Sequence, residues 1–257
     1  MRQRPPPTPP LNITTLLQSL TSPPNAARNA MSGRVLVLYF HGNAGNIGNR
    51  LIMYNQLWEQ CQVNVLAVDY RGYGDSEEAT PTERGLNADA DAALAWLLKR
   101  PDVQSGSIFV LGRSLGGAVS IALAARVAKA RPALFRFRGV VVENTFTSIN
   151  DIGKLVLPFL AKVPPALLHC FLTNRWRSID AVAELPQGVP VLFVSGAKDE
   201  LIPQAQMAAL RERAVEAGVD VEWREFANGH HNDTWQSAGY QDMLSDFIHR
   251  RCMVVDE

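Results

Sequence analysis

Short apolar segments alternate with longer amphipathic ones from residue 34 onward. The apolar segments are rich in Val, Leu and Ile, as is typical of strands that are buried on both faces of a parallel sheet. These predicted strands are residues 35–40, 63–68, 108–111, 140–142, 189–194 and 219–226. Most of the intervals between them have the spacing of amphipathic helices. The alternation predicts an α/β fold with a mostly parallel sheet that helices cover on both faces.

The clearest helix signal follows the tetrapeptide at residues 80–83. It matches a capping box with Pro81 at the first helical position, and apolar residues follow it at steps of three and four. These apolar residues are Leu86, Ala90, Ala93, Leu94 and Leu97. A second helix is predicted from near Pro203 to Gly218, as an amphipathic cover of the sheet.

One folded domain is predicted at residues 34–250. Residues 1–33 are rich in proline and irregular, and residues 251–257 are expected to form a C-terminal tail. The interval 144–189 is too long for a simple crossover and too apolar for a linker. It is therefore expected to form a small helical cap over one end of the sheet.

No segment of the chain is predicted to cross a membrane as a helix. The nearest candidate, residues 155–172, is interrupted by Lys162 and three prolines. The N-terminus has arginines and prolines but lacks the apolar core of a signal peptide.

The composition and net charge of the chain limit the kinds of molecule that it is expected to bind. The chain has 25 Lys and Arg residues and 25 Asp and Glu residues, so its formal net charge is zero. A nucleic-acid-binding role is not expected, because it would need a basic excess to neutralise phosphates. The three cysteines, Cys61, Cys170 and Cys252, fit neither a disulfide framework nor a zinc site and favour a reducing, intracellular compartment. Neither a metal nor a cofactor is predicted.

The strongest chemical signal is Gly112-Arg113-Ser114-Leu115-Gly116, which lies between a predicted strand and a predicted helix. A Gly-x-Ser-x-Gly sequence at such a turn is typical of a nucleophile elbow, in which the serine takes a strained positive φ. The glycines are needed because a Cβ at either position would meet the neighbouring strand or helix. The alternative is a glycine-rich turn that contains a serine by chance.

A serine nucleophile needs a base and an acid, which should follow it in the order acid, then base. Two adjacent histidines, His230 and His231, lie on the loop after the last strand, and the residues alone leave open which one is the base. Asp199 follows the preceding strand and is the expected acid, because a carboxylate there can orient the imidazole. Glu143, one strand earlier, is the rival acid.

A tetrahedral intermediate also needs donors for its oxyanion. The Leu115 N–H begins a helix directly after Ser114, where the helix dipole favours negative charge. The second donor is expected to be the Asn43 N–H, on the loop after the first strand. His41, on the same loop, is expected to brace it through backbone hydrogen bonds rather than to act as a base.

Several motifs together resemble the α/β-hydrolase superfamily and, more narrowly, the α/β-hydrolase domain-containing protein 13 family of serine hydrolases. The resemblance covers about residues 34–250. It is carried by YFHGNAGN (39–46), DYRGYGDS (69–76), GRSLGG (112–117), VENTF (142–146), SGAKDELIP (195–203) and GHHNDTW (229–235). In that family the base is the histidine immediately before Asn-Asp, which implies His231.

The resemblance also implies N-terminal features that the sequence predicts only in part. Relatives carry two N-terminal antiparallel strands, and many carry a membrane anchor upstream of them. Residues 11–20 are expected to supply one such strand. The first strand and any anchor are not predicted from this sequence, which would be either truncated or naturally late in its start.

The expected function is that of a serine hydrolase that cleaves an ester or thioester through an acyl-enzyme intermediate. Its substrate would be a small-molecule ester, a lipid or an acylated protein, and the apolar cap region would suit an acyl chain. The protein is expected to be intracellular, either soluble or in peripheral contact with a membrane. Two alternatives remain: a serine peptidase or amidase of the same fold, and a non-catalytic scaffold.

Overall fold

The computed structural model describes residues 35–103, 105–130, 136–156 and 174–252. Within these residues, six parallel strands form one sheet in the order β2-β1-β3-β4-β5-β6. The strands are β1 (Leu36–Phe40), β2 (Asn64–Val68), β3 (Ile108–Arg113), β4 (Gly139–Glu143), β5 (Val191–Gly196) and β6 (Val221–Phe226). Each predicted strand is present, with its ends displaced by at most two residues. The predicted α/β fold is confirmed.

Alternate side chains of each strand enter two different apolar cores. In β1, Leu38 and Phe40 belong to the larger core, and Val37 and Tyr39 belong to the smaller one. This follows from the two-residue side-chain period of a strand.

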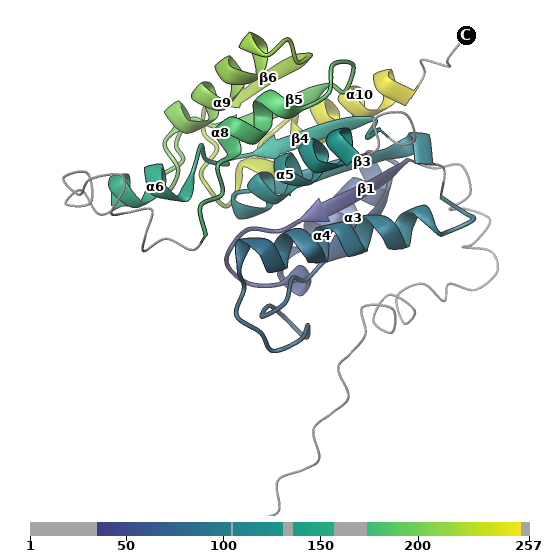
Figure 1. Cartoon of the computed structure of the whole chain (residues 1–257). Helices are drawn as coiled ribbons and strands as arrows, with labels where there is room; N and C mark the ends of the chain where they lie inside the picture. Colours follow the sequence, from purple (N-terminus) through teal and green to yellow (C-terminus); the bar gives the residue numbers. More distant parts are fainter. Residues whose placement is uncertain (1–34, 104, 131–135, 157–173, 253–257) are drawn as a thin grey trace, which may run out of the picture.

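Helices cover both faces of the sheet (Figure 1). On one face, α4 (Glu83–Leu98), α5 (Leu115–Ala130) and α9 (Gln204–Glu216) close the larger core. On the other, α3 (Leu51–Gln60) and α10 (Tyr240–Cys252) close the smaller core. The predicted two-sided cover is therefore confirmed.

The start of α4 corrects the predicted capping box. The N-cap is Thr82, whose side chain accepts a hydrogen bond from the Gly85 N–H, so the helix begins two residues later than expected. Glu83 does not cap the helix. Its carboxylate accepts hydrogen bonds from the backbone N–H groups of Arg175 (2.6 Å) and Trp176 (3.0 Å). The Glu83 side chain, which the local sequence pattern predicted to cap the helix, instead binds a segment that is distant in the sequence.

The predicted helix from Pro203 to Gly218 is present as α9. Its C-terminus is closed by Gly218, which has a φ of +78°, a conformation that favours glycine. The last helix, α10, runs two residues past the predicted domain end at 250.

Several predicted features lie outside the described residues. They include the Pro-rich segment 1–33 with its candidate strand at 11–20, Cys170, and residues 157–173 of the predicted cap. The described parts of the cap interval contain α6 (Ile149–Val156), α8 (Ser178–Ala181) and a short 3-10 helix, Val182–Glu184. Among the described residues, no helix has the length and hydropathy needed to span a bilayer.

Candidate active site

Ser114 lies between the last residue of β3 and the first residue of α5, at a sharp turn. Its φ is +56°, in the left-handed region that a non-glycine residue rarely adopts. The Ser114 N–H donates a hydrogen bond to the Glu143 carbonyl oxygen of the neighbouring strand (2.9 Å). The strained turn expected of a nucleophile elbow is therefore present, and the adjacent strand helps to hold it.

The two motif glycines are required by close packing. A Cβ on Gly112 would lie 2.0 Å from the Gly116 carbonyl oxygen. A Cβ on Gly116 would lie 2.0 Å from the carbonyl oxygen of Phe40 in β1. Both clashes are with backbone atoms, so the steric reason predicted for these glycines is confirmed.

Ser114, Asp199 and His231 meet at the carboxyl ends of the strands. The His231 Nε2 lies 3.1 Å from the Ser114 Oγ, and its Nδ1 lies 2.7 Å from the Asp199 Oδ2. The His231 and Asp199 side chains are 7% and 1% exposed, so water competes little for their contact. The other oxygen of Asp199 accepts hydrogen bonds from the N–H groups of Leu201 (2.9 Å) and Ile202 (2.8 Å).

The structure separates the two adjacent histidines. His231 is buried and faces Ser114, whereas the His230 side chain is 48% exposed. The His230 Nδ1 lies 3.2 Å from a carboxylate oxygen of Glu200, which is also exposed. His249 is elsewhere, with its Nε2 3.1 Å from the Cys61 carbonyl oxygen.

The rival acid, Glu143, contacts other groups. Its side chain is fully buried, and its Oε2 accepts a hydrogen bond from the Tyr240 hydroxyl (2.6 Å). Burial raises the pKa of Glu143 above its ordinary value, and the positive charge of Arg113 opposes part of that increase. The structure thus brings Asp199 to the imidazole and directs Glu143 to a tyrosine.

The loop after β1 packs directly against the serine. A Cβ placed on Gly42 would lie 3.4 Å from the Ser114 Cβ. The next residue is Asn43, and its N–H has no hydrogen-bond acceptor among the described residues. The Leu115 N–H is at the first position of α5, where the helix itself offers no acceptor. Both predicted donors therefore lie beside the serine, with N–H groups that a substrate could use.

His41 braces this loop, as the sequence indicated. Its Nδ1 lies 2.6 Å from the Gly42 carbonyl oxygen, and the Tyr70 hydroxyl donates to the His41 carbonyl oxygen (2.9 Å). Its Nε2 is 3.1 Å from an Asp69 carboxylate oxygen but forms no hydrogen bond among the described residues. The same oxygen accepts the Ile47 N–H (2.9 Å), so the loop is held from several sides.

Ser114 opens onto a cavity of about 360 Å³. That volume lies in the range of small-molecule sites. The cavity is lined by Asn43, Tyr73, Pro81, Thr82, Leu86, Ser114, Leu115, Phe146, Ile149, Asn174 and Trp176. Most of these side chains are apolar or aromatic, and none is acidic.

Comparison with known proteins shows the family of this chain. The model of the family described as Hydrolase_4, serine aminopeptidase, S33, matches residues 32–187, which is more than half of the chain. The chain belongs to the α/β-hydrolase superfamily. WAV2 of Arabidopsis thaliana, an alpha/beta hydrolase domain-containing protein, is 40% identical over 210 residues, covering 79% of this chain and 65% of WAV2. Protein bem46 of Schizosaccharomyces pombe is 37% identical over 215 residues, covering 84% of this chain and 67% of bem46.

This α/β hydrolase thus spans about two thirds of the length of those curated relatives. Among solved structures, an alpha-beta hydrolase from Vibrio vulnificus matches with a TM-score of 0.67 at 21% identity, covering 82% of this chain and 73% of that one. The Pyrococcus furiosus esterase Pf2001 matches with a TM-score of 0.64 at 20% identity, covering 86% and 84%. At such identities the structural matches support the fold alone.

Sequence analysis of this α/β hydrolase missed two kinds of site residue. One is part of the cavity lining that precedes Ser114 in the chain, such as Tyr73, whose hydroxyl donates to the Asn43 Oδ1 (2.6 Å). The other is Asn144, a buried residue with a φ of +47°. Both belong to motifs that the resemblance included, DYRGYGDS and VENTF, and those motifs were the available signal.

Proposed function

We propose that this chain is a serine hydrolase that cleaves esters or thioesters through an acyl-enzyme intermediate. Ser114 is the nucleophile, His231 the general base and acid, and Asp199 the residue that orients His231. The observation that carries the proposal is the continuous chain of contacts from Asp199 through His231 to Ser114, at a strained turn. A carboxylate, an imidazole and a hydroxyl in this order can perform nucleophilic acyl transfer on any fold that holds them together.

In the first step, the Ser114 Oγ attacks the carbonyl carbon while its proton moves to the His231 Nε2. Asp199 accepts the hydrogen bond from His231 Nδ1 and stabilises the imidazolium that forms. Collapse of the tetrahedral intermediate transfers that proton to the leaving alcohol or thiol and leaves an acyl-serine. Water, activated by the same imidazole, then releases the acid and restores Ser114.

The N–H groups of Leu115 and Asn43 are proposed to hold the oxyanion. Both residues line the same cavity as Ser114, and the Leu115 N–H lies at the positive end of α5. Donors fixed in advance stabilise the developing charge without the reorganisation that water would need.

The cavity supports a substrate with an acyl chain. Leu86, Phe146, Ile149 and Trp176 offer apolar surface beside Ser114. The proposed substrate is therefore a small-molecule, lipid or acyl-protein ester. We also propose, from the six motifs, that this chain is related to the α/β-hydrolase domain-containing protein 13 family of serine hydrolases.

An intracellular protein in peripheral contact with a membrane fits the same substrate class. The small number of cysteines supports the compartment. The membrane contact is supported by a Saccharomyces cerevisiae relative that is named an uncharacterised membrane protein, which is 34% identical over 216 residues.

A peptidase or amidase is the second candidate, because the matching family is described as serine aminopeptidase. An aminopeptidase needs a negative group to pair with the amino terminus of its substrate. The described lining of the cavity contains no Asp or Glu side chain, which favours the ester.

A fluorophosphonate probe tests the proposal directly, since it reacts with activated serines. The wild type should be labelled at Ser114, and Ser114→Ala should lose the label and about 10⁴–10⁶-fold in kcat. Ser195→Ala is the matched control, because Ser195 is buried and its hydroxyl has no hydrogen-bond partner among the described residues. This variant should keep both label and activity.

A substrate panel separates the two candidates. On p-nitrophenyl esters, kcat/KM should rise with acyl-chain length until the apolar lining is filled, and aminoacyl amides should be poor substrates. Faster turnover of the amides would replace the esterase proposal with the peptidase. A folded wild type that is neither labelled nor active on either series would favour the scaffold.

A further inference from the structure

Asn144 is the second strained residue at the carboxyl edge of the sheet. It directly follows β4, its φ is +47°, and it is 1% exposed. Asparagine adopts this conformation more readily than most residues, but it still carries strain that its surroundings must hold. Ser114 and Asn144 thus follow adjacent strands, β3 and β4, in the same unusual conformation.

The side-chain amide of Asn144 is fully engaged. Its Oδ1 accepts a hydrogen bond from the Gly196 N–H (2.8 Å). Its Nδ2 lies 3.0 Å from the Thr234 Oγ1, 3.2 Å from the His230 carbonyl oxygen and 3.4 Å from the His231 carbonyl oxygen. An N–H can only donate and a carbonyl can only accept, so these partners determine the orientation of the amide.

Each side of this amide holds a segment that carries a proposed catalytic residue. Gly196 ends β5 and begins the turn that presents Asp199, whose own N–H donates back to the Gly196 carbonyl oxygen (3.3 Å). The carbonyl oxygens on the other side belong to the loop that carries His231. The amide therefore connects the segment that carries the acid to the loop that carries the base.

The backbone of the preceding residue holds the nucleophile. Glu143 accepts the Ser114 N–H through its carbonyl oxygen, at 2.9 Å. Residues 143 and 144, at the end of β4, consequently touch the backbone of all three segments, although β4 contributes no side chain to the proposed proton transfer.

Direct backbone contacts also join the acid turn to the base loop: the Lys198 N–H donates a hydrogen bond to the Gly229 carbonyl oxygen (2.9 Å). A Cβ on Gly196 would lie 2.4 Å from the Thr234 Oγ1 and 2.5 Å from the Gly229 carbonyl oxygen, so the two segments are in close contact here. Arg113 supports the base loop from the nucleophile side, with its Nη1 donating a hydrogen bond to the Asn232 carbonyl oxygen (3.0 Å).

We propose that Asn144 is a positioning residue that sets the distances from Asp199 to His231 and from His231 to Ser114. This inference rests on the proposed function, because it assigns a role within that triad. Asn144 does not line the described cavity, so its loss should lower kcat and leave KM for a small ester nearly unchanged.

Two variants test the hydrogen bonds of the Asn144 amide in different ways. Asn144→Gly removes the amide but suits the positive φ, so the strain disappears along with the contacts. Asn144→Asp keeps an oxygen for the Gly196 N–H and places a second oxygen against the two histidine carbonyls. Each should lower kcat for a p-nitrophenyl ester by about 10–100-fold, since displacements near 1 Å can have effects of that size.

The control is a variant that is destabilised without touching the site. Leu244→Ala creates a cavity in the smaller core, under α10, where Leu244 is fully buried. At temperatures well below its midpoint of thermal unfolding, Leu244→Ala should retain the wild-type kcat. If Asn144 only stabilises the fold, Asn144→Gly should also retain the wild-type kcat under these conditions, and that result would overturn the proposal.

A spectroscopic measurement separates this inference from the proposed function. The His231 Nδ1–H that faces Asp199 should give a downfield proton NMR signal in the wild type, which needs no substrate. The signal should be lost or moved in Asn144→Gly and retained in Leu244→Ala. An unchanged signal in Asn144→Gly would refute the positioning role, whether or not the wild type hydrolyses esters. A wild type that gives the signal but hydrolyses no ester would refute only the proposed function.

Discussion

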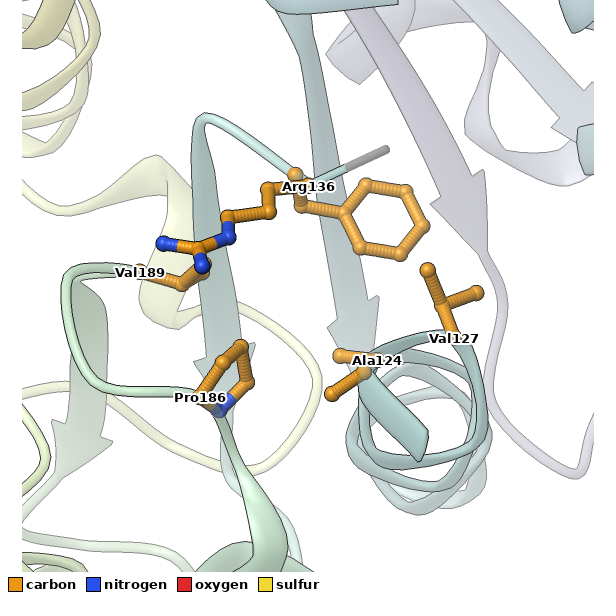
Figure 2. Close-up of a pocket in the computed structure, with 7 residues that line it drawn as sticks. Ala124, Val127, Arg136, Pro186 and Val189 are labelled. Carbon is orange, nitrogen blue, oxygen red and sulfur yellow. The ribbon is translucent and has the colours of Figure 1, made fainter. Parts of the chain in front are cut away.

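The two ends of the sheet are built differently. At the carboxyl end, Ser114 and Asn144 hold strained backbone, and the buried polar groups of Asp199 and His231 pair with one another. Near the amino end of β4 and β5, a cavity of about 30 Å³ lies under the last turns of α5. Figure 2 shows Val127, Pro186 and Val189 around this small space, with Arg136 at its edge.

The difference shows how one sheet can serve two purposes. Buried polar groups and strained backbone oppose folding, so they accumulate where a reaction needs them. Apolar side chains at the other end gain stability from burial and need no fixed orientation for chemistry. Changes at the carboxyl end should therefore alter catalysis more than stability, and changes at the amino end should do the reverse.

Among the changes that test this contrast between the two ends of the sheet, Asp199→Asn should have the largest effect on kcat. The variant oxygen can still accept the N–H groups of Leu201 and Ile202, so its NH₂ group would face His231. The imidazole would then accept at Nδ1 and carry its proton on Nε2, where it could not take the Ser114 proton. We expect kcat to fall on the order of 10⁴-fold, measured by steady-state ester hydrolysis.

Glu143→Gln is the matched carboxylate control for that prediction. It removes the rival acid but keeps a similar side chain beside Tyr240, so it should retain most of the wild-type kcat. If it lost as much activity as Asp199→Asn, the assignment of the acid to Asp199 would be wrong.

Glu143→Gln should also change the thermal stability of the protein, by an amount that depends on pH and is smaller than the effect of Asp199→Asn on kcat. Burial raises the pKa of Glu143 above its ordinary value of 4.5, so the folded protein keeps a proton that the unfolded chain releases first. The contribution of this group to stability is complete below the unfolded pKa and is lost as pH rises through the folded pKa. In thermal unfolding, Glu143→Gln should therefore gain Tm relative to the wild type as pH rises above about 4.5. A difference in Tm that is constant across pH would show that the two states share one pKa.

The smallest expected effect is at the amino end. Val127→Ile adds one methylene beside the cavity in Figure 2 and should raise the free energy of unfolding by up to about 0.8 kcal/mol. Denaturant unfolding measures this gain, and ester hydrolysis should show an unchanged kcat. A change in kcat here would break the contrast between the two ends.

Local sequence was sufficient for much of the fold and for part of the site. Strand positions followed from apolar runs, and the turn at Ser114 followed from glycines whose neighbours leave no space for a side chain. Capping was less predictable, because Glu83 was recruited by Arg175 and Trp176, about 90 residues later. Residue types in chain order also indicated Asp199 as the acid.

Tertiary structure decided what depends on contacts between distant segments. By themselves, the residues left His230 and His231 equivalent, and the resemblance selected the second. Only the folded chain places that ring beside a serine 117 positions away. The contribution of Tyr73 to the cavity and the contacts of the Asn144 amide were likewise not predicted. The physical reason is that periodicity and turn chemistry act over a few residues, whereas a buried hydrogen bond depends on which strands become neighbours in the sheet.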